Sequence, residues 1–151
     1  VARTYASETP AAAGGQSSLR VTFSLPHATL LDRVAVRQVN LTSTDGSMGI
    51  LAGHVPSLAQ LVPGVVEVVP EAAGAPADRY FVSGGFAVIH PDSTLAISAI
   101  EAVPLADLDP AAIRAALDAA TATANGAAGA SEAQKVEARI QLEVFTAAQE
   151  A

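Results

Sequence analysis

The hydrophobic periodicity of this chain changes once, close to Asp107. Before this point apolar residues alternate with polar residues, as in strands buried on one side, and after it they recur at the roughly 3.6-residue period of an amphipathic helix. Elements of these two kinds bury their apolar positions by packing in layers. We therefore predict an N-terminal antiparallel β-sandwich over residues 19–106, followed by a C-terminal αα-hairpin over residues 107–151.

The strand pattern is clearest after Leu19, where apolar and polar residues alternate as far as Leu25. Leu30-Leu31 predicts a second, short strand. The alternation resumes at Val34 and shifts phase by one residue near Arg37-Gln38, as at a β-bulge. Turn signals recur about every ten residues, which favours antiparallel pairing over parallel crossovers. Further strands are predicted for the apolar runs Val65–Val69, Tyr80–Val82, Phe86–Ile89 and Leu95–Ile100.

Glycines predict two special backbone positions in the sandwich. Asp45-Gly46 and Gly49 indicate a tight reversal in which positive φ is needed. Gly84-Gly85 is interpreted as structural, at a bulge where the strands bend.

The C-terminal part carries start and stop signals for two helices. Asp109 is predicted to cap the first helix, with Pro110 at its first position, and Asn125-Gly126 to end it. Ser131 and Gln134 have the spacing of a capping box for the second helix. An alanine-rich hairpin buries little area by itself, so we expect it to pack on the sandwich or on another subunit. The predicted apolar stripes are Ile113, Leu117 and Ala120 or Ala124 in the first helix, and Val136, Ile140 and Val144 in the second.

Residues 1–18 are rich in small and polar residues without an apolar period, which predicts a disordered tail. Arg3-Thr4-Tyr5 before Ala6-Ser7 is similar to the arginine-guided cleavage sites that end mitochondrial presequences. An arbitrary end of the chain is the alternative interpretation.

The charge balance excludes one class of partner. The formal net charge is −7 and Lys135 is the only lysine, so the sequence has no basic stripe for nucleic acid. The long uncharged stretch Gly46–Val66 contains Pro56 and Pro63 and does not fit a membrane-spanning helix. We interpret this stretch as a loop followed by a buried strand.

No catalytic, metal-binding or nucleotide-binding motif is found, and no cofactor is expected. The sequence lacks Gly-x-Ser-x-Gly, a phosphate-binding P-loop and Gly-x-Gly-x-x-Gly. His27, His54 and His90 stand far apart, and the acidic pair Asp107 and Asp109 is explained by helix capping. His54 either bonds a nearby backbone group and fixes a loop, or contributes to an interface.

Three motifs, in this order and spacing, resemble one known family. They are Asp45–Pro56, Leu61–Val66 and Tyr80–Phe86, and the predicted helical hairpin follows them. The combination is similar to the central-stalk subunit of F-type ATP synthases, called epsilon in bacteria and chloroplasts and delta in mitochondria. The resemblance extends from Leu19 to about Glu150.

This resemblance implies a non-catalytic rotor subunit that couples the gamma subunit to the c-ring during rotary ATP synthesis. The implied partners are gamma, the c-ring and the small mitochondrial epsilon subunit, and the implied location is the matrix side of the mitochondrial inner membrane, as a peripheral component. The residues implied to face the c-ring are Gly46, Ser47, Met48 and Gly49, and those implied to face gamma are His54, Pro56, Ser57 and Leu58.

Two other functions are kept as alternatives. In the family, a nucleotide-sensing inhibitory epsilon-type regulator carries Ile/Leu-Asp-x-x-Arg-Ala, but here Leu108-Asp109 lies farther from Arg114-Ala115. The hairpin also has seven acidic residues against Arg114, Lys135 and Arg139, and this charge disfavours binding to an acidic segment. The third hypothesis is an unrelated β-sandwich enzyme or ligand-binding module.

Overall fold

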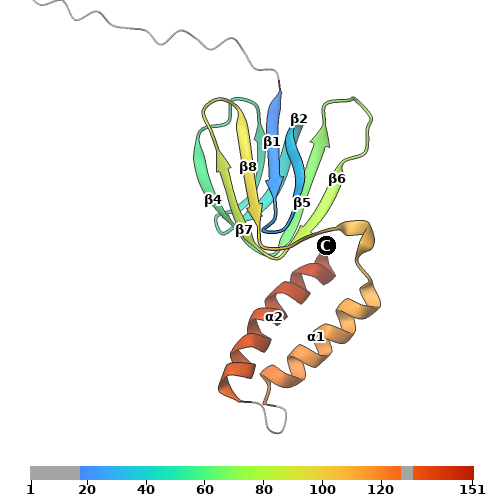
Figure 1. Cartoon of the computed structure of the whole chain (residues 1–151). Coiled ribbons are helices and arrows are strands. Elements are labelled where there is room, and N and C mark those ends of the chain that lie inside the picture. Colours follow the sequence, from blue (N-terminus) through green and yellow to red (C-terminus); the bar gives the residue numbers. More distant parts are fainter. Residues whose placement is uncertain (1–17, 127–130) are drawn as a thin grey trace, which may run out of the picture.

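The computed structural model describes residues 18–126 and 131–151, and the rest of the predicted tail lies outside them. Figure 1 shows strands at the N-terminal end of the described chain and two helices after them. The strands are β1 (Leu19–Ser24), β2 (Thr29–Ser43), β3 (Gly46–Leu51), β4 (Ser57–Leu61), β5 (Gly64–Pro70), β6 (Asp78–Val82), β7 (Gly85–Ile89), β8 (Thr94–Ala99) and β9 (Ala102–Pro104). A 3₁₀ turn, η1 (Leu105–Asp107), leads to α1 (Pro110–Ala124) and α2 (Glu132–Glu150).

The strands form one sheet that folds over on itself as the predicted sandwich. Their order is β1-β8-β7-β4-β2-β5-β6-β9, with β3 paired to β2 and a further pairing between β1 and β2. One part of the prediction is wrong, because β1 runs parallel to β8 while the other pairs are antiparallel. The parallel pairing covers an edge of β1 that would otherwise expose unpaired backbone groups.

The core lies between the inner faces of the sheet and consists mainly of valine, leucine and isoleucine. Phe23 is fully buried and meets Tyr80 edge to face, with 5.5 Å between the ring centroids. The largest fully buried side chains besides Phe23 are Leu19, Ile50, Leu95, Ile97, Val21, Val36, Val39, Val66 and Val82.

The strand β2 shows where the predicted pattern was right and where it was wrong. The β2–β5 register shifts between Val36 and Gln38, and Val36, Val39 and Leu41 are all buried, which confirms the predicted change of phase. Leu30-Leu31, however, belongs to the same 15-residue strand and forms no separate one. The strand continues through Arg33, whose φ of 49° bends it without interrupting it.

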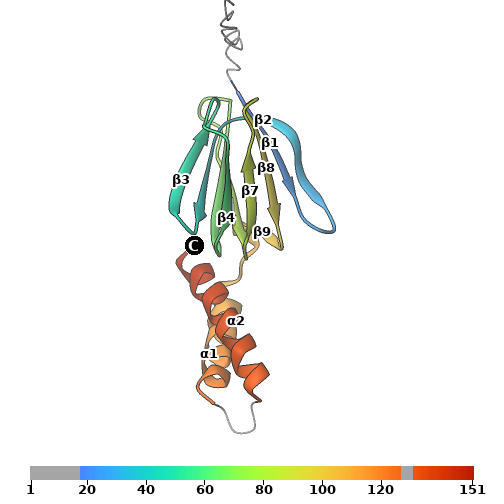
Figure 2. The same ribbon diagram turned by 90° about the vertical axis from the view of Figure 1, so that its left-hand side faces the viewer.

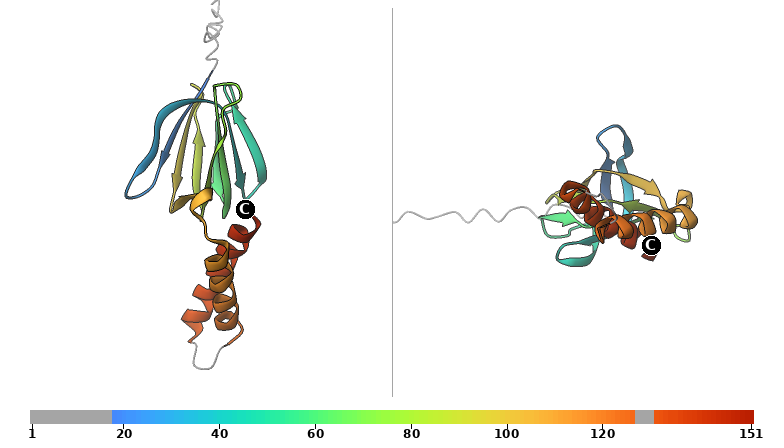
Figure 3. Two further views of the ribbon diagram at one scale, coloured as in Figure 1. Left: turned by 90° about the vertical axis from the view of Figure 1, so that its right-hand side faces the viewer. Right: turned by 90° about the horizontal axis from the view of Figure 1, so that it is seen from below.

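The hairpin extends from one end of the sandwich, as the views from two sides and from below agree (Figures 2 and 3). Its predicted caps are confirmed: Asp109 accepts a hydrogen bond from the Ala111 amide at 2.8 Å, and Ser131 forms a complete capping box with Gln134. Asn125 ends α1, and Gly126 follows with a φ of 88°. No described helix has both the length and the apolar character needed to cross a membrane.

The predicted stripe of α1 is confirmed, and that of α2 is wrong at Val136 and Ile140 but not at Val144, which is half-buried. Ile113 and Leu117 are half-buried, whereas Val136 and Ile140 are 53% and 61% exposed. The buried residues of α2 are Ala138 and Ala148, and Leu142 and Phe145, four and seven residues after Ala138, are half-buried on the same side of the helix. Two bulky apolar residues of α2 therefore remain on the outside of the hairpin.

Candidate functional site

The outer face of β4 and β7 is apolar although it is exposed. In this antiparallel pair Leu58 lies opposite Val88, and Gln60 lies opposite Phe86. Leu58 is 67% exposed and Phe86 is 52% exposed. Outward positions of a solvated sheet are usually polar, so exposed apolar residues on neighbouring strands indicate a surface that another molecule covers.

This apolar surface continues beyond both ends of the two strands. Val55, in the loop before β4, is 69% exposed, and Ile100, just after β8, is 65% exposed. Between the sandwich and α2 lies a groove of about 500 Å³ whose lining includes Phe86, Ile100, Ile140 and Val144. We call the exposed set the apolar face, and it comprises Val55, Leu58, Phe86, Ile100, Val136 and Ile140.

The segment predicted to face gamma joins this apolar face at its loop end. Leu58 is part of the face, and Pro56 and Ser57 are exposed beside it. The His54 backbone amide donates to the Leu51 carbonyl at 3.1 Å, and its ring Nδ1 lies 2.9 Å from the Val55 carbonyl. This geometry confirms that the ring bonds a nearby backbone group and fixes the loop. It also presents Val55 outward.

The segment predicted to face the c-ring is a strand, not a turn. Gly46, Ser47, Met48 and Gly49 all belong to β3, and the reversal lies just before them, at Thr44-Asp45. The Ser43 hydroxyl closes this turn by donating to the Gly46 carbonyl at 3.0 Å and accepting from the Asp45 amide at 3.2 Å. Positive φ is confirmed at Gly46, at 115°, but not at Gly49.

Met48 and Gly49 therefore have internal roles that the sequence prediction missed. Met48 is half-buried and packs against the core. A Cβ on Gly49 would lie 2.9 Å from Gln38 Nε2 and 3.1 Å from Asn40 Oδ1. Alternation along β2 could have shown that these two side chains share a face, but it could not have shown that they lie over Gly49.

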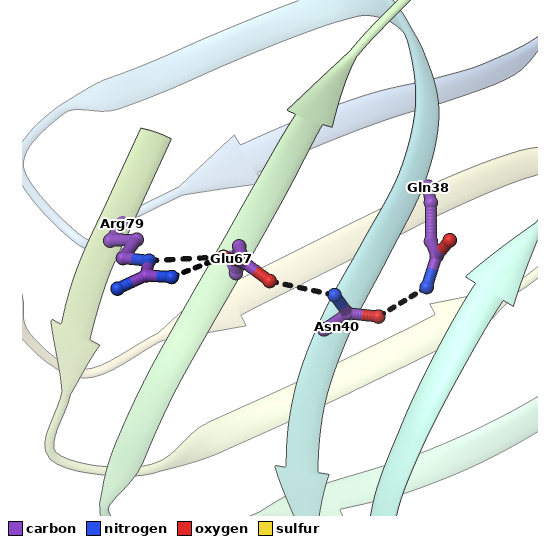
Figure 4. Close-up of polar contacts among 4 residues, drawn as sticks. All are labelled: Gln38, Asn40, Glu67 and Arg79. Atoms are coloured by element: carbon purple, nitrogen blue, oxygen red, sulfur yellow. Dashed lines mark hydrogen bonds and ion pairs between the residues drawn. The ribbon is translucent and has the colours of Figure 1, made fainter. Parts of the chain in front are cut away.

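The side chains beside Gly49 belong to an array of polar contacts across three strands, shown in Figure 4. Gln38 donates to Asn40, whose Nδ2 donates to Glu67 Oε2 at 2.8 Å. Arg79 completes the array through Nη2, 2.9 Å from Glu67 Oε1. The hydrogen bond from Asn40 and the neighbouring Arg79 guanidinium hold the pKa of Glu67 below its ordinary value. The array ties β2, β5 and β6 together on the outside of the sheet.

The two predicted contact segments lie at opposite ends of β3. Gly46 begins this six-residue strand and Leu51 ends it, three residues before His54. Six residues of strand span about 17 Å. The residues predicted to contact different partners are thus held apart at a fixed separation.

The described residues contain no cluster of three or more His, Cys, Asp or Glu side chains that could hold a metal ion. The chemistry available on the apolar face is burial of surface against a partner, since neither nucleophile nor paired acid and base is brought together there.

Comparisons with known proteins identify the family. The model of the beta-sandwich domain of the ATP synthase Delta/Epsilon chain matches residues 18–104. Over 149 residues the chain is 49% identical to a protein named ATP synthase subunit delta, mitochondrial, from Kluyveromyces lactis, which covers 99% of this chain and 86% of that protein. The protein of the same name from Saccharomyces cerevisiae is 44% identical over 135 residues, covering 89% and 80% of the two chains.

Solved structures show the same likeness. A chain in the cryo-EM structure of the Euglena gracilis mitochondrial ATP synthase OSCP/F1/c-ring superposes with a TM-score of 0.83 and 30% identity, covering 92% of this chain and 84% of that one. A chain in the central stalk/c-ring of the Tetrahymena thermophila enzyme, at 18% identity and a TM-score of 0.59, shows the fold alone. The family that the three sequence motifs predicted is confirmed: the chain belongs to the delta/epsilon family of ATP synthase subunits, and proteins named mitochondrial delta subunits are among its relatives.

Proposed function

We propose that this chain is a non-catalytic central-stalk rotor subunit of a mitochondrial F-type ATP synthase and that its apolar face docks on gamma. The observation that carries the proposal is the exposure of Leu58 and Phe86, which lie diagonally across the paired strands β4 and β7. A surface of this kind gains free energy when a partner removes it from water. The names of the relatives and of the solved complexes support the same assignment.

The other end of β3 is proposed to face the c-ring. Gly46 and Ser47 are exposed there and polar, next to the Thr44-Asp45 turn. Gly46 has no side chain, so a polar loop of a partner could approach its backbone closely. Met48 and Gly49 would support this contact from within the sheet. One strand would then separate the two docking surfaces.

The α2 side of the groove between the sandwich and α2 is the proposed place for the small epsilon subunit, next to the gamma contact on β4 and β7. Ile140 and Val144 form one wall, and Phe86 and Ile100 form the other. The residues of α2 that are excluded from the hairpin would be covered in this way. The subunit would be a peripheral component at the matrix side of the inner membrane, held there through its partners.

The hairpin offers little support for nucleotide sensing. The Asp109 carboxylate is engaged as the cap of α1, where it accepts from the Ala111 amide. Arg114 lines a cavity of about 340 Å³ in which Gln149 carries the other polar side chain and the remaining lining side chains are apolar.

The docking proposal is tested by the double variant Leu58→Gln and Phe86→Gln, expressed in mitochondria that lack the native subunit. We expect gamma and c subunits to co-purify with the native chain, and we expect gamma to be lost with the variant. Val34→Gln is the matched control, since Val34 is an exposed apolar strand residue, 41% accessible, outside the apolar face. Melting temperatures of the isolated chains establish that each variant folds.

Retention of gamma by a folded double variant would contradict the docking assignment. Calorimetric titration of the full chain with ATP separates the alternative regulator. Saturable binding at millimolar or tighter affinity, abolished by Arg114→Ala, would favour that alternative.

A further inference from the structure

A second concave surface lies away from the apolar face, where β1, β2 and the β7–β8 turn meet. Its volume is about 360 Å³. We call it the arginine notch, and its polar lining consists of Arg20, Thr22, Arg33, His90, Asp92 and Thr94. All but one of these side chains carry hydrogen-bond donors at neutral pH.

Backbone strain occurs beside this notch. Among the described residues other than glycine, only Arg33 and Ser93 have positive φ, at 49° and 61°. Such conformations are unfavourable for residues other than glycine and persist where the surrounding structure or a function requires them. Arg33 lies in the wall of the notch, and Ser93 lies between two lining residues, Asp92 and Thr94.

Hydrogen bonds fix the arginine backbones to the walls. The Arg20 amide donates to the Ser93 carbonyl at 3.0 Å, and strand pairing sets Arg20 beside Thr94. The Arg33 amide approaches the Thr22 hydroxyl oxygen at 3.4 Å. The Arg20 guanidinium therefore starts from a regular strand position, and the Arg33 guanidinium from the irregular point of β2 beside Thr22.

Neither guanidinium forms an ion pair within the described chain. The ion pairs seen there join Arg79 to Glu67 and Lys135 to Glu132. Asp92 is the acidic residue of the notch, and its Oδ1 already accepts from the amide and hydroxyl of Thr94. Two arginines against one carboxylate leave an excess positive charge, in a chain whose net charge is −7.

We propose that the arginine notch binds a phosphoryl group. Guanidinium groups present N–H donors in a planar fork that matches the spacing of phosphate oxygens, and the Thr22 hydroxyl, which only accepts from the Arg33 amide, can donate to a remaining oxygen. The strained conformation of Arg33 is then explained as the means by which its side chain reaches the notch. The phosphoryl group could belong to a free small molecule or to a lipid headgroup.

The test is a titration of the isotope-labelled full chain with inorganic phosphate, followed by NMR of the Arg20 and Arg33 Nε–H groups and the Thr94 amide. We expect saturable shifts confined to the notch. Arg20→Gln should weaken binding by about tenfold or more, because a charge-assisted contact is lost. Asp92→Asn should tighten it, because a repulsive charge is removed while an oxygen remains for Thr94.

Arg33→Gly gives the sharpest result, because glycine accepts positive φ without strain. We expect this variant to melt at the same temperature as the native chain or higher, yet to bind phosphate about tenfold or more weakly. Arg37→Gln is the matched control, since it removes one positive charge from the same strand outside the notch and should change binding little.

Vesicle flotation distinguishes the two sources of the group. Arg33-dependent binding to vesicles of phosphatidic acid, and not to phosphatidylcholine alone, would identify a lipid headgroup even if free phosphate binds too weakly to saturate. Binding of neither phosphate nor these vesicles would overturn the proposal. So would equal losses for Arg33→Gly and Arg37→Gln, or notch shifts produced by an acidic peptide and not by phosphate.

Discussion

Gly85 and Gly49 both lie close to neighbouring atoms, but the two sets of neighbours differ in kind. A Cβ on Gly85 would lie 2.2 Å from the Ser98 carbonyl oxygen and 2.8 Å from the Ala99 Cα, and the φ of Gly85 is 153°. These are backbone atoms of the paired strand β8 and cannot retreat alone. The neighbours of Gly49 are the ends of two side chains, which can move.

We therefore expect Gly85→Ala to destabilise the fold by about 3 kcal/mol or more, and Gly49→Ala by about 1 kcal/mol. Urea denaturation of the isolated full chain measures both. Similar losses at the two positions would contradict the distinction between backbone and side-chain neighbours. Gly85 is thus predicted to be structural, as the sequence suggested for Gly84-Gly85.

Glu67 gives the stability of the chain a defined pH dependence. The hydrogen bond from Asn40, followed by Arg79, lowers its pKa in the folded state. A lowered pKa stabilises the fold at pH values above the unfolded pKa, near 4.3, and the stabilisation is lost as pH falls through the folded pKa. Protonation at acid pH removes the contact with Arg79.

Glu67→Gln should therefore lower the melting temperature at pH 7 and have a smaller effect at pH 3. Glu71→Gln, in the exposed loop after β5, is the matched control for loss of one negative charge. Thermal melting of the three chains across this pH range provides the measurement. A difference between native chain and Glu67→Gln that stays constant with pH would refute the proposed linkage.

At the scale of elements, the helix ends were easier to predict than the helix faces. The capping residues Asp109 and Ser131 bond amides two or three residues away, so their roles are local and can be predicted from the sequence. The buried face of α2 depends on its partner helix. The inward side of α2 carries Ala138 with the half-buried Leu142 and Phe145, whereas Val136 and Ile140 lie outside.

This packing makes a prediction for α2. Ala138 is 2% exposed, so Ala138→Leu should separate the helices and destabilise the hairpin by about 1–3 kcal/mol. Ile140→Gln, on the outside, should leave the isolated chain as stable as before. Circular dichroism during thermal melting distinguishes the two variants. An equal fall in melting temperature for Ile140→Gln would indicate that Ile140 is packed inside the hairpin, as the sequence predicted.

The sandwich strands were largely predictable for the same local reason, since alternation and turn residues act over a few positions. The β-bulge near Arg37-Gln38 was visible as a change of phase. The parallel pairing of β1 with β8 was not, because it joins segments more than 70 residues apart in the chain. For the candidate site, motifs identified Leu58, but only the folded arrangement brings Phe86, Ile100 and Ile140 to the same surface.

At the scale of the whole molecule, two bodies of unequal stability are joined end to end. The sandwich has a continuous buried core, whereas the hairpin buries Ala120, Ala138 and Ala148 among its described residues. The end of α2 returns to the sandwich near β5, which gives the hairpin a second attachment besides η1 (Figure 1). Covering the apolar face would add a further contact across both bodies. We expect the hairpin to gain more stability from partners than the sandwich does.

The placement of the two predicted contact segments at opposite ends of β3 also has a mechanical consequence. A force passing between them would run along the strand, parallel to its pairing with β2 from Ser43–Gly46 to Gln38–Leu51. In this shear geometry the hydrogen bonds between β2 and β3 bear the load together. A force applied perpendicular to the strands would instead break these hydrogen bonds one after another. The sandwich is therefore oriented to resist extension along the one direction in which its two neighbours would pull.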